Sequence, residues 1–170
     1  ESLIDIGGGP ATYACHFCLH NPKLRATVFD LKTARPHALQ TIKQLGLGGR
    51  VRFVEGNYLK NKIKDRYDVA FLSHILHAES PEHCAVIIKK AVSALNPGGK
   101  IFIQEFVMNN KKDGPLFPAL FALNMLLGSD GGTAYTEKEL CDMLIQAGAK
   151  KVRHLKFVMQ NGASIVCGIV

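Results

Sequence analysis

The sequence predicts an α/β fold with a doubly wound sheet of seven strands, mostly parallel with an antiparallel last strand. Three observations predict it. Short runs rich in β-branched residues alternate with helical stretches, a pattern typical of a parallel sheet with helices on both faces. A glycine-rich turn follows the first of these runs. The chain ends in two consecutive strands, which indicates a hairpin and hence one reversed strand.

The first two thirds of the chain supply five strands and three helices. The expected strands are residues 2–6, 25–30, 51–54, 67–73 and 100–106. The expected helices are residues 10–19, 34–45 and 81–95, where apolar residues recur every three to four positions. Pro10 and Pro81 stand where a first helical turn tolerates proline, and the Asn-Pro-Gly-Gly sequence at 96–99 is expected to end the third helix.

The pattern changes after Phe106. Residues 107–135 form an insertion with a polar start, an almost wholly apolar stretch at 115–127 and a loop at 128–133, and we expect substrate contacts there. A helix at 136–147 follows, because Thr136 and Glu139 have capping-box spacing and Gly148 ends it. Strands at 151–159 and 163–170 then enclose a turn at 160–162.

Composition limits the class of protein. The 170 residues make one ordinary domain, and 47% hydrophobic with 21% charged residues is typical of soluble globular proteins. No apolar run reaches the roughly 18 residues of a membrane span, so we expect no membrane partner. The net charge of +7 leaves a nucleic-acid or other anionic partner open on composition alone. The chain begins at Glu1, close to a strand, and reads like the interior of a longer protein.

The cysteines indicate the compartment and raise the question of a metal. An odd count of five, with no signal-like segment, favours reduced thiols and a cytoplasmic location. Cys15 and Cys18 form a CxxC pair flanked by His16 and His20, so a zinc site has to be considered. A structural zinc site needs a second ligand pair, and these residues fall on a predicted helix facing several directions. We therefore expect buried thiols and no metal.

The glycine turn at residues 7–9 predicts a ligand at the carboxyl ends of the strands. Glycine lets a ligand approach the backbone, and the helix that follows offers free N–H groups. Asp30 ends the second strand about 20 residues later, where a carboxylate can accept both hydroxyls of a ribose. Together they imply an adenosine-containing ligand. Thr12 at the third glycine position weakens a dinucleotide interpretation without excluding it, and the final hairpin argues further against it.

At this point the sequence resembles the class I S-adenosylmethionine-dependent methyltransferases, and more narrowly the small-molecule O-methyltransferases, which include the plant caffeate, acetylserotonin and many bacterial enzymes. The motifs that carry the resemblance are residues 5–10, 29–30, 50–58, 72–77, 96–100, Glu105 and 131–136. It implies that residues 1–170 are a Rossmann-like catalytic domain binding S-adenosylmethionine, with S-adenosylhomocysteine as product. It also implies a homodimer formed through an N-terminal dimerisation domain that this chain lacks.

The resemblance also assigns cofactor contacts. Gly7 and Gly9 would line the methionine part, Asp30 would bind the ribose, and Asn57 and Tyr58 would hold the adenine. Three further cofactor contacts are expected at Asp5, Leu31 and Ser73. The family usually has Asp where Asn57 stands, so the adenine bond loses charge assistance and weaker cofactor binding is expected. The alternative interpretation of Asn57 is a plain turn residue after Gly56.

Methyl transfer to a hydroxyl needs a base of near-neutral pKa beside the methyl group. His77 follows the fourth strand on the cofactor side, and Glu105 near the end of the adjacent strand can hold its second ring nitrogen. The resemblance gives the same assignment of catalytic base and orienting carboxylate. The alternative is that His77 only enters a helix, and His74 is a competing histidine that we expect on the cofactor side or in packing.

Acceptor contacts are expected from the insertion, where a flat, largely apolar molecule would fit. The candidate substrate-binding residues are Met108, Phe117, Phe121, Asn124, Met125 and Tyr135. Their helical spacing also suits simple core packing. Two departures from the family pattern affect the base: Ala78-Glu79 follow His77 where Asp-Trp is common, and Ala134 replaces a second orienting glutamate found in the plant enzymes.

Two other functions are compatible with parts of the sequence. Lysine and arginine runs at 60–66 and 150–156 suggest a nucleic-acid methyltransferase, but Ser-His-Ile-Leu-His at 73–77 lacks both the Asn/Asp-Pro-Pro-aromatic turn and the Pro-Cys of such enzymes. We therefore expect no nucleic-acid partner. The other alternative is a protein on the same fold that binds S-adenosylmethionine without catalysis.

Overall fold

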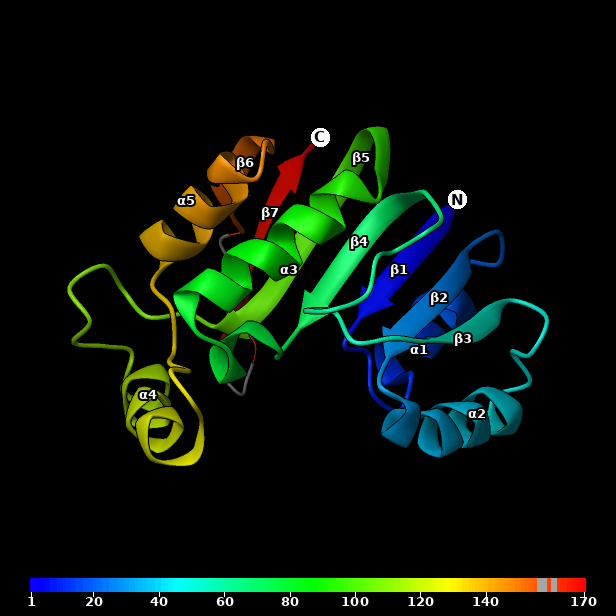
Figure 1. Ribbon diagram of the computed structural model, residues 1–170, viewed down its shortest axis with the longest axis horizontal. Helices are drawn as coiled ribbons and strands as arrows, with labels where there is room; N and C mark the ends of the chain where they lie inside the picture. Colours follow the sequence, from blue (N-terminus) through cyan, green and yellow to red (C-terminus); the bar gives the residue numbers. More distant parts are fainter. Residues whose placement is uncertain (156–158, 160–161) are drawn as a thin grey trace.

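The computed structural model describes residues 1–155, 159 and 162–170, and these build a single seven-stranded sheet (Figure 1). The strand order is β3-β2-β1-β4-β5-β7-β6. The strands are β1 (Ser2–Ile6), β2 (Arg25–Asp30), β3 (Val51–Glu55), β4 (Tyr67–Ser73), β5 (Leu95–Phe106), β6 (Lys150–His154) and β7 (Ala163–Ile169). Strands β1 to β5 pair in parallel, and β7 is antiparallel to both of its neighbours, β5 and β6. The predicted fold class is confirmed.

Helices cover both faces of this sheet. They are α1 (Thr12–His20), α2 (Arg35–Gln44), α3 (Pro81–Ser93), α4 (Leu116–Gly128) and α5 (Glu137–Gln146), with short 3₁₀ turns η1 (Lys32–Ala34) and η2 (Leu76–Ala78). In the view of Figure 1, α3 and α5 lie in front of the sheet and α1 lies behind it, while α4 stands apart at one end. Among the described residues no helix is long and apolar enough to cross a membrane.

Alternation along the strands divides the core into two layers. Neighbouring strand residues point to opposite faces, so Ile4 and Leu72 pack with α3 and α5 in one apolar cluster. Their neighbours Leu3 and Phe71 pack with α1 and α2 in the other. Because both faces of β1 and β4 are buried, these strands read as nearly continuous apolar runs in the sequence.

Three local predictions need correction or fall outside the described residues. Helix α1 begins at Thr12, so Pro10 lies in the turn before it, because Gly9 and Ala11 adopt positive φ angles of 50° and 66° that no helix tolerates. The sequence at 96–99 belongs to β5 as an irregularity opposite Asp68, where Gly98 N–H donates to the Val170 carbonyl at 2.7 Å. Residues 156–158 and 160–161, part of the last predicted hairpin, lie outside the described residues.

The predicted helix starts that flank the site are confirmed at two positions. Pro81 occupies the first turn of α3, and the Ser80 hydroxyl accepts a hydrogen bond from His83 N–H. Thr136 and Glu139 form a complete capping box at the start of α5. Both caps anchor segments that pass beside the carboxyl end of β4, and they therefore help to fix the site described next.

Candidate functional site

The glycine turn after β1 is closely packed at its first two glycines, Gly7 and Gly8, and open at the third, Gly9. A Cβ on Gly7 would lie 2.5 Å from the Ile75 side chain, and one on Gly8 would lie 2.6 Å from the Asp5 carboxyl carbon. A Cβ on Gly9 would meet nothing within 4 Å. The Asp30 carboxylate accepts Gly9 N–H at 2.7 Å, which ties the turn to the end of β2. The turn is therefore fixed by its contacts with Ile75, Asp5 and Asp30, and it has room for a ligand beside Gly9.

Besides His74, which is described below, two side chains at this edge carry buried polar atoms without a hydrogen bond of normal geometry in the described structure. They are the Asp5 carboxylate, 1% exposed, and the Ser73 hydroxyl at the end of β4. Burial raises the pKa of Asp5 from 3.8 to about 7, the Ala14 backbone amide lowers it in part, and the Asp30 charge raises it further. Buried polar groups are normally paired, so these two mark a place where a polar ligand is expected.

The segment after β3 borders the same edge. Gly56 is required here because a Cβ would lie 2.3 Å from the Phe29 ring. The Asn57 Oδ1 accepts the backbone N–H groups of Leu59 and Lys60 at 2.8 and 3.1 Å, so Asn57 serves as a turn residue in this structure. A hollow of about 520 Å³ opens beside it, lined by Leu31, Lys32, Thr33, Glu55, Gly56, Asn57 and Asn61.

Tyr58 is fixed by a contact that the sequence pattern does not reveal. Its hydroxyl donates to Glu79 Oε1 at 2.9 Å, and Glu79 Oε2 lies 2.9 Å from His83 Nδ1. Glu79 stands where the family often has tryptophan, as noted above, and here it connects the segment after β3 to the start of α3. The side chain of Tyr58 is thereby held beside the predicted adenine position.

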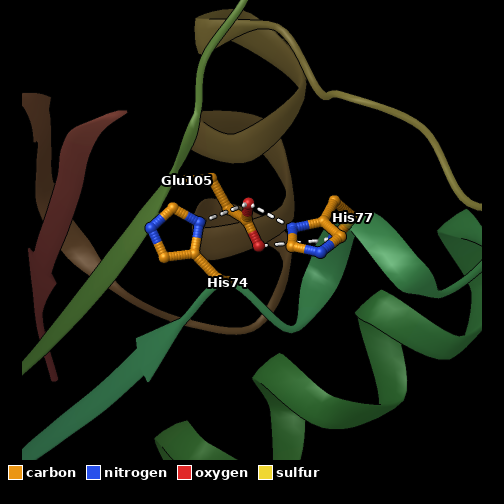
Figure 2. A group of neighbouring side chains, drawn as sticks. All are labelled: His74, His77 and Glu105. Carbon is orange, nitrogen blue, oxygen red and sulfur yellow. Dashed lines mark hydrogen bonds and ion pairs between the residues drawn. The ribbon is translucent and has the colours of Figure 1, made fainter. Parts of the chain in front are cut away.

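His77 and Glu105 form the centre of the chemical end of the site (Figure 2). His77 Nδ1 lies 2.8 Å from Glu105 Oε2. Glu105 Oε1 accepts the backbone N–H groups of Leu76 and His77 at 2.9 and 3.3 Å, so the carboxylate also fixes η2. Burial alone would raise the pKa of Glu105, but its contacts with His74 and His77 outweigh burial and hold the pKa below the ordinary value. Glu105 is therefore an anion facing an imidazole.

His74 shares this carboxylate, and sequence reasoning did not place it there. Its Nδ1 lies 3.7 Å from Glu105 Oε2, and Figure 2 shows both rings turned toward the same carboxylate. A φ of 55°, uncommon for a residue other than glycine, sets the direction of its side chain. On its other side, His74 Nε2 lies 3.2 Å from the Gln104 amide nitrogen.

An aromatic wall stands next to the two histidines. Phe106, which the sequence analysis did not select, lies at its centre with ring centroids 4.5 Å from His74, 4.9 Å from Phe117 and 4.7 Å from Phe121. Phe121 also meets the His77 ring edge-on at 4.9 Å. The position of Phe106 directly after Glu105 at the end of a strand was the available signal. Phe121 thus contacts His77 directly, and Phe117 reaches the group through Phe106 and Phe121.

The other expected acceptor residues lie in different surroundings. Tyr135 is buried, and its hydroxyl donates to the Glu79 carbonyl at 2.6 Å. Met108 is 4% exposed and forms a bridge with Thr136. Asn124 is exposed and Met125 half-buried on α4. Among the described residues the ring contacts of His77 are with His74, Phe106 and Phe121. Acceptor binding by Met108, Asn124, Met125 and Tyr135 stays a prediction.

The CxxC pair, Cys15 and Cys18, was considered above as a zinc site. Cys15 and Cys18 are both fully buried in the cluster beneath α1, and Cys18 Sγ lies within hydrogen-bond distance of the Leu24 carbonyl, at 3.5 Å. They behave as small core residues, as expected. Among the residues that the structure describes, one group has the spacing of metal ligands, and it is His74, His77 and Glu105.

Comparisons with known proteins agree with this geometry. The O-methyltransferase domain family matches residues 1–150. The chain is 30% identical to a 3-hydroxy-5-methyl-1-naphthoate 3-O-methyltransferase of Streptomyces sahachiroi, over 98% of this chain and 48% of that protein. It is 34% identical to a tetracenomycin polyketide synthesis 8-O-methyl transferase of Streptomyces glaucescens, over 90% of this chain and 45% of that protein. The solved structure of PigF with SAH superposes with a TM-score of 0.90 at 27% identity, over 99% of this chain and 50% of that one.

The chain therefore belongs to the O-methyltransferase domain family, which confirms the resemblance described above. It spans about half the length of the curated relatives it matches. Its sheet, with one reversed strand beside β5, is the α/β arrangement of the solved relatives.

Proposed function

We propose that this protein transfers the methyl group of S-adenosylmethionine to a hydroxyl of a small aromatic acceptor, with His77 as general base. The observation that carries the proposal is the 2.8 Å contact between His77 Nδ1 and the buried Glu105 carboxylate, beside an aromatic wall. Family membership and the printed activities of the relatives support it.

The residues at the carboxyl edge of the sheet fit the cofactor. Asp5 and Ser73 offer buried polar atoms without a hydrogen bond of normal geometry, and Gly9 leaves open space above the turn. Asp30 presents a carboxylate at the end of β2 for the ribose, with Leu31 beside it and the hollow at Asn57 next to both. Tyr58, held by Glu79, would border the adenine. When bound, the cofactor supplies a methyl group on a positively charged sulfur.

The protein's own contribution is proton handling and orientation. Since the Glu105 anion accepts the Nδ1 proton, neutral His77 keeps its lone pair on Nε2, where it can accept the acceptor's hydroxyl proton as the new O–CH₃ bond forms. The imidazolium that results is stabilised by Glu105, which stays ionised. The wall of Phe106, Phe117 and Phe121 would hold a flat acceptor and exclude water.

The test is release of S-adenosylhomocysteine from cofactor and a panel of phenols. His77→Ala should lower kcat by about 10²- to 10⁴-fold while calorimetry shows unchanged cofactor binding. His37→Ala, at an exposed histidine on α2, is the matched control and should keep full turnover. Full turnover of His77→Ala would remove the base assignment, and cofactor binding without any turnover of the unmodified protein would favour the non-catalytic alternative.

We further propose that residues 1–170 act as the catalytic domain, with 107–135 as the acceptor side, in a cytoplasmic homodimer that takes no nucleic acid. The position of α4 beside η2, and the Phe117 and Phe121 contacts with Phe106, support the role of the insertion. The dimer remains a prediction that sedimentation velocity would test. Absence of binding to RNA and DNA at low salt would test the prediction about nucleic acid.

A further inference from the structure

The arrangement of His74, His77 and Glu105 has the composition of a two-histidine, one-carboxylate metal site (Figure 2). The candidate ligand atoms of the three residues lie within 4.8 Å of one another. His74 directly follows β4, His77 lies three residues further on in η2, and Glu105 lies near the end of β5, so two neighbouring backbone segments hold them. We propose that these residues bind a divalent transition-metal ion, and that the bound ion switches off His77 as a base.

The orientation of the three side chains favours an ion between them. Glu105 Oε1 is occupied by two backbone N–H groups, which leaves Oε2 to face both rings. His77 Nδ1 lies 2.8 Å and His74 Nδ1 3.7 Å from that oxygen. His74 Nδ1 is also buried without a hydrogen bond of normal geometry. Three donor atoms therefore converge on one point, and one of them lacks a close partner.

The distances suit a first-row metal after small movements. Bonds of about 2.0–2.1 Å place tetrahedral ligand atoms about 3.3 Å apart. The two observed separations, 2.8 and 3.7 Å, lie on either side of that value, so each changes by about half an ångström. Rotation of the two imidazole rings about their side-chain bonds can supply changes of this size.

The donor set also indicates which ions bind. Imidazole nitrogen suits Zn²⁺, Co²⁺, Ni²⁺ and Cu²⁺, whereas Mg²⁺ and Ca²⁺ prefer sites made of oxygen alone. The side chains of His74 and His77 are 23% and 15% exposed, so an ion can enter from solvent. Gln104 contacts His74 Nε2, and its amide can present either nitrogen or oxygen to the ring. It can therefore support the tautomer in which Nδ1 holds the metal.

The consequence for His77 follows from the two nitrogens of its ring, and this step rests on the proposed function. In the proposed mechanism, the metal-free His77 donates from Nδ1 to Glu105 Oε2, 2.8 Å away, and keeps its lone pair on Nε2. A metal on Nδ1 binds the lone pair of Nδ1 itself, so the proton on Nδ1 is released to solvent and the neutral ring carries its single proton on Nε2. Nε2 then donates and can no longer accept a proton from the acceptor. Metal binding and general-base catalysis by His77 therefore exclude each other.

The binding test does not depend on turnover. The protein is stripped with a chelator and titrated with Zn²⁺ by calorimetry and with Co²⁺ by visible absorption. We expect about one ion per chain and a cobalt spectrum without the thiolate charge-transfer band that cysteine ligands would produce. His74→Asn should weaken binding by more than about tenfold, because it removes one of three ligands. Asparagine tolerates the positive φ at position 74, and a thermal melt checks that the variant folds.

The control is His83→Asn, at a histidine that also lies 2.9 Å from a carboxylate, that of Glu79. It should bind metal like the unmodified protein. Equal affinity of the unmodified protein and His74→Asn would overturn the site, as would a cobalt spectrum dominated by thiolate. Failure of the unmodified protein to bind any of these ions would overturn it as well.

The second arm measures turnover with Zn²⁺ at its own dissociation constant. Turnover should fall about twofold and return when a chelator is added, while calorimetry shows unchanged cofactor binding. Full turnover with the ion bound would overturn the inhibitory step and leave the binding site in place. A protein without turnover in any condition would contradict the proposed function, and the titrations would still decide whether the metal binds.

Discussion

Asp5 should make the protein less stable as the pH rises, and Asp5→Asn should remove this effect. The carboxylate is 1% exposed, and burial raises its pKa from 3.8 to about 7. Below pH 3.8 both the folded and unfolded chains are protonated at Asp5, so it contributes no pH dependence there. Between these two values the unfolded chain ionises while the folded chain keeps its proton. The free energy of unfolding therefore falls as the pH rises.

The size of the effect follows from the interval between the two pKa values. Each pH unit within it changes the free energy of unfolding by about 1.4 kcal/mol, so the total approaches about 4 kcal/mol by pH 7. Asparagine has nearly the same shape and no charge. Asp5→Asn should therefore gain stability relative to the unmodified protein as the pH rises from 5 to 7.

Urea unfolding at pH 5, 6, 7 and 8 without cofactor measures this difference. Asp130→Asn, at an exposed aspartate in the loop after α4, is the control and should follow the pH profile of the unmodified protein. If the unmodified protein and Asp5→Asn kept a constant difference across the series, Asp5 would not be a proton-holding group and the reasoning from its burial would be wrong.

Three further predictions concern individual contacts. Glu105→Gln should lower kcat by about 10²- to 10⁴-fold without changing cofactor affinity, because an amide NH₂ facing His77 Nδ1 favours the tautomer with its proton on Nε2. Release of S-adenosylhomocysteine at saturating cofactor measures kcat, and an unchanged value would contradict the pairing of Glu105 with His77. Asn57→Asp should tighten cofactor binding about tenfold in calorimetry, since one carboxylate oxygen can keep the hydrogen bonds from the Leu59 and Lys60 backbone while the other faces the adenine. Equal affinity of the two proteins would favour the interpretation of Asn57 as a turn residue without a cofactor contact. Thr136→Ala should cost about 1 kcal/mol in urea unfolding through loss of the capping box, and no change would show that the cap is dispensable.

Local patterns were enough to predict most of the fold. The strands around residues 2–6, 25–30 and 67–73 were predicted with the bounds that the structure has, because buried parallel strands are short apolar runs between turn signals. The positions of the glycine turn and Asp30 at the ends of adjacent strands were predicted for a similar reason, and the contact from Gly9 N–H to the Asp30 carboxylate joins them. The start of α1 was misjudged because Ala11 adopts a left-handed conformation that its residue type does not announce.

The contacts around His77 were harder to predict because they join distant parts of the chain. His74 and Glu105 are far apart in sequence, and the φ of 55° at His74 decides where its ring points. Phe106 has the pattern of an ordinary strand residue in the sequence, and its contact with Phe117 of α4 depends on the tertiary fold. Tyr135 had the composition of a substrate contact, yet its hydroxyl is committed to the Glu79 carbonyl. Side-chain direction of this kind depends on tertiary packing, which spacing along the sequence does not encode.

In the ribose-binding role proposed for Asp30, its two amide contacts have a consequence for selectivity among nucleosides. One oxygen accepts Gly9 N–H at 2.7 Å and the other accepts Leu31 N–H at 2.6 Å, so the carboxylate cannot rotate freely. Each oxygen keeps one lone-pair direction, and the two directions are fixed relative to each other. Two carboxylate oxygens held at a fixed distance can accept hydrogen bonds from the 2′- and 3′-hydroxyls of a ribose at the same time. A 2′-deoxy or 3′-deoxy analogue would leave one acceptor facing no donor, so the protein should discriminate between sugars before any methyl group is transferred.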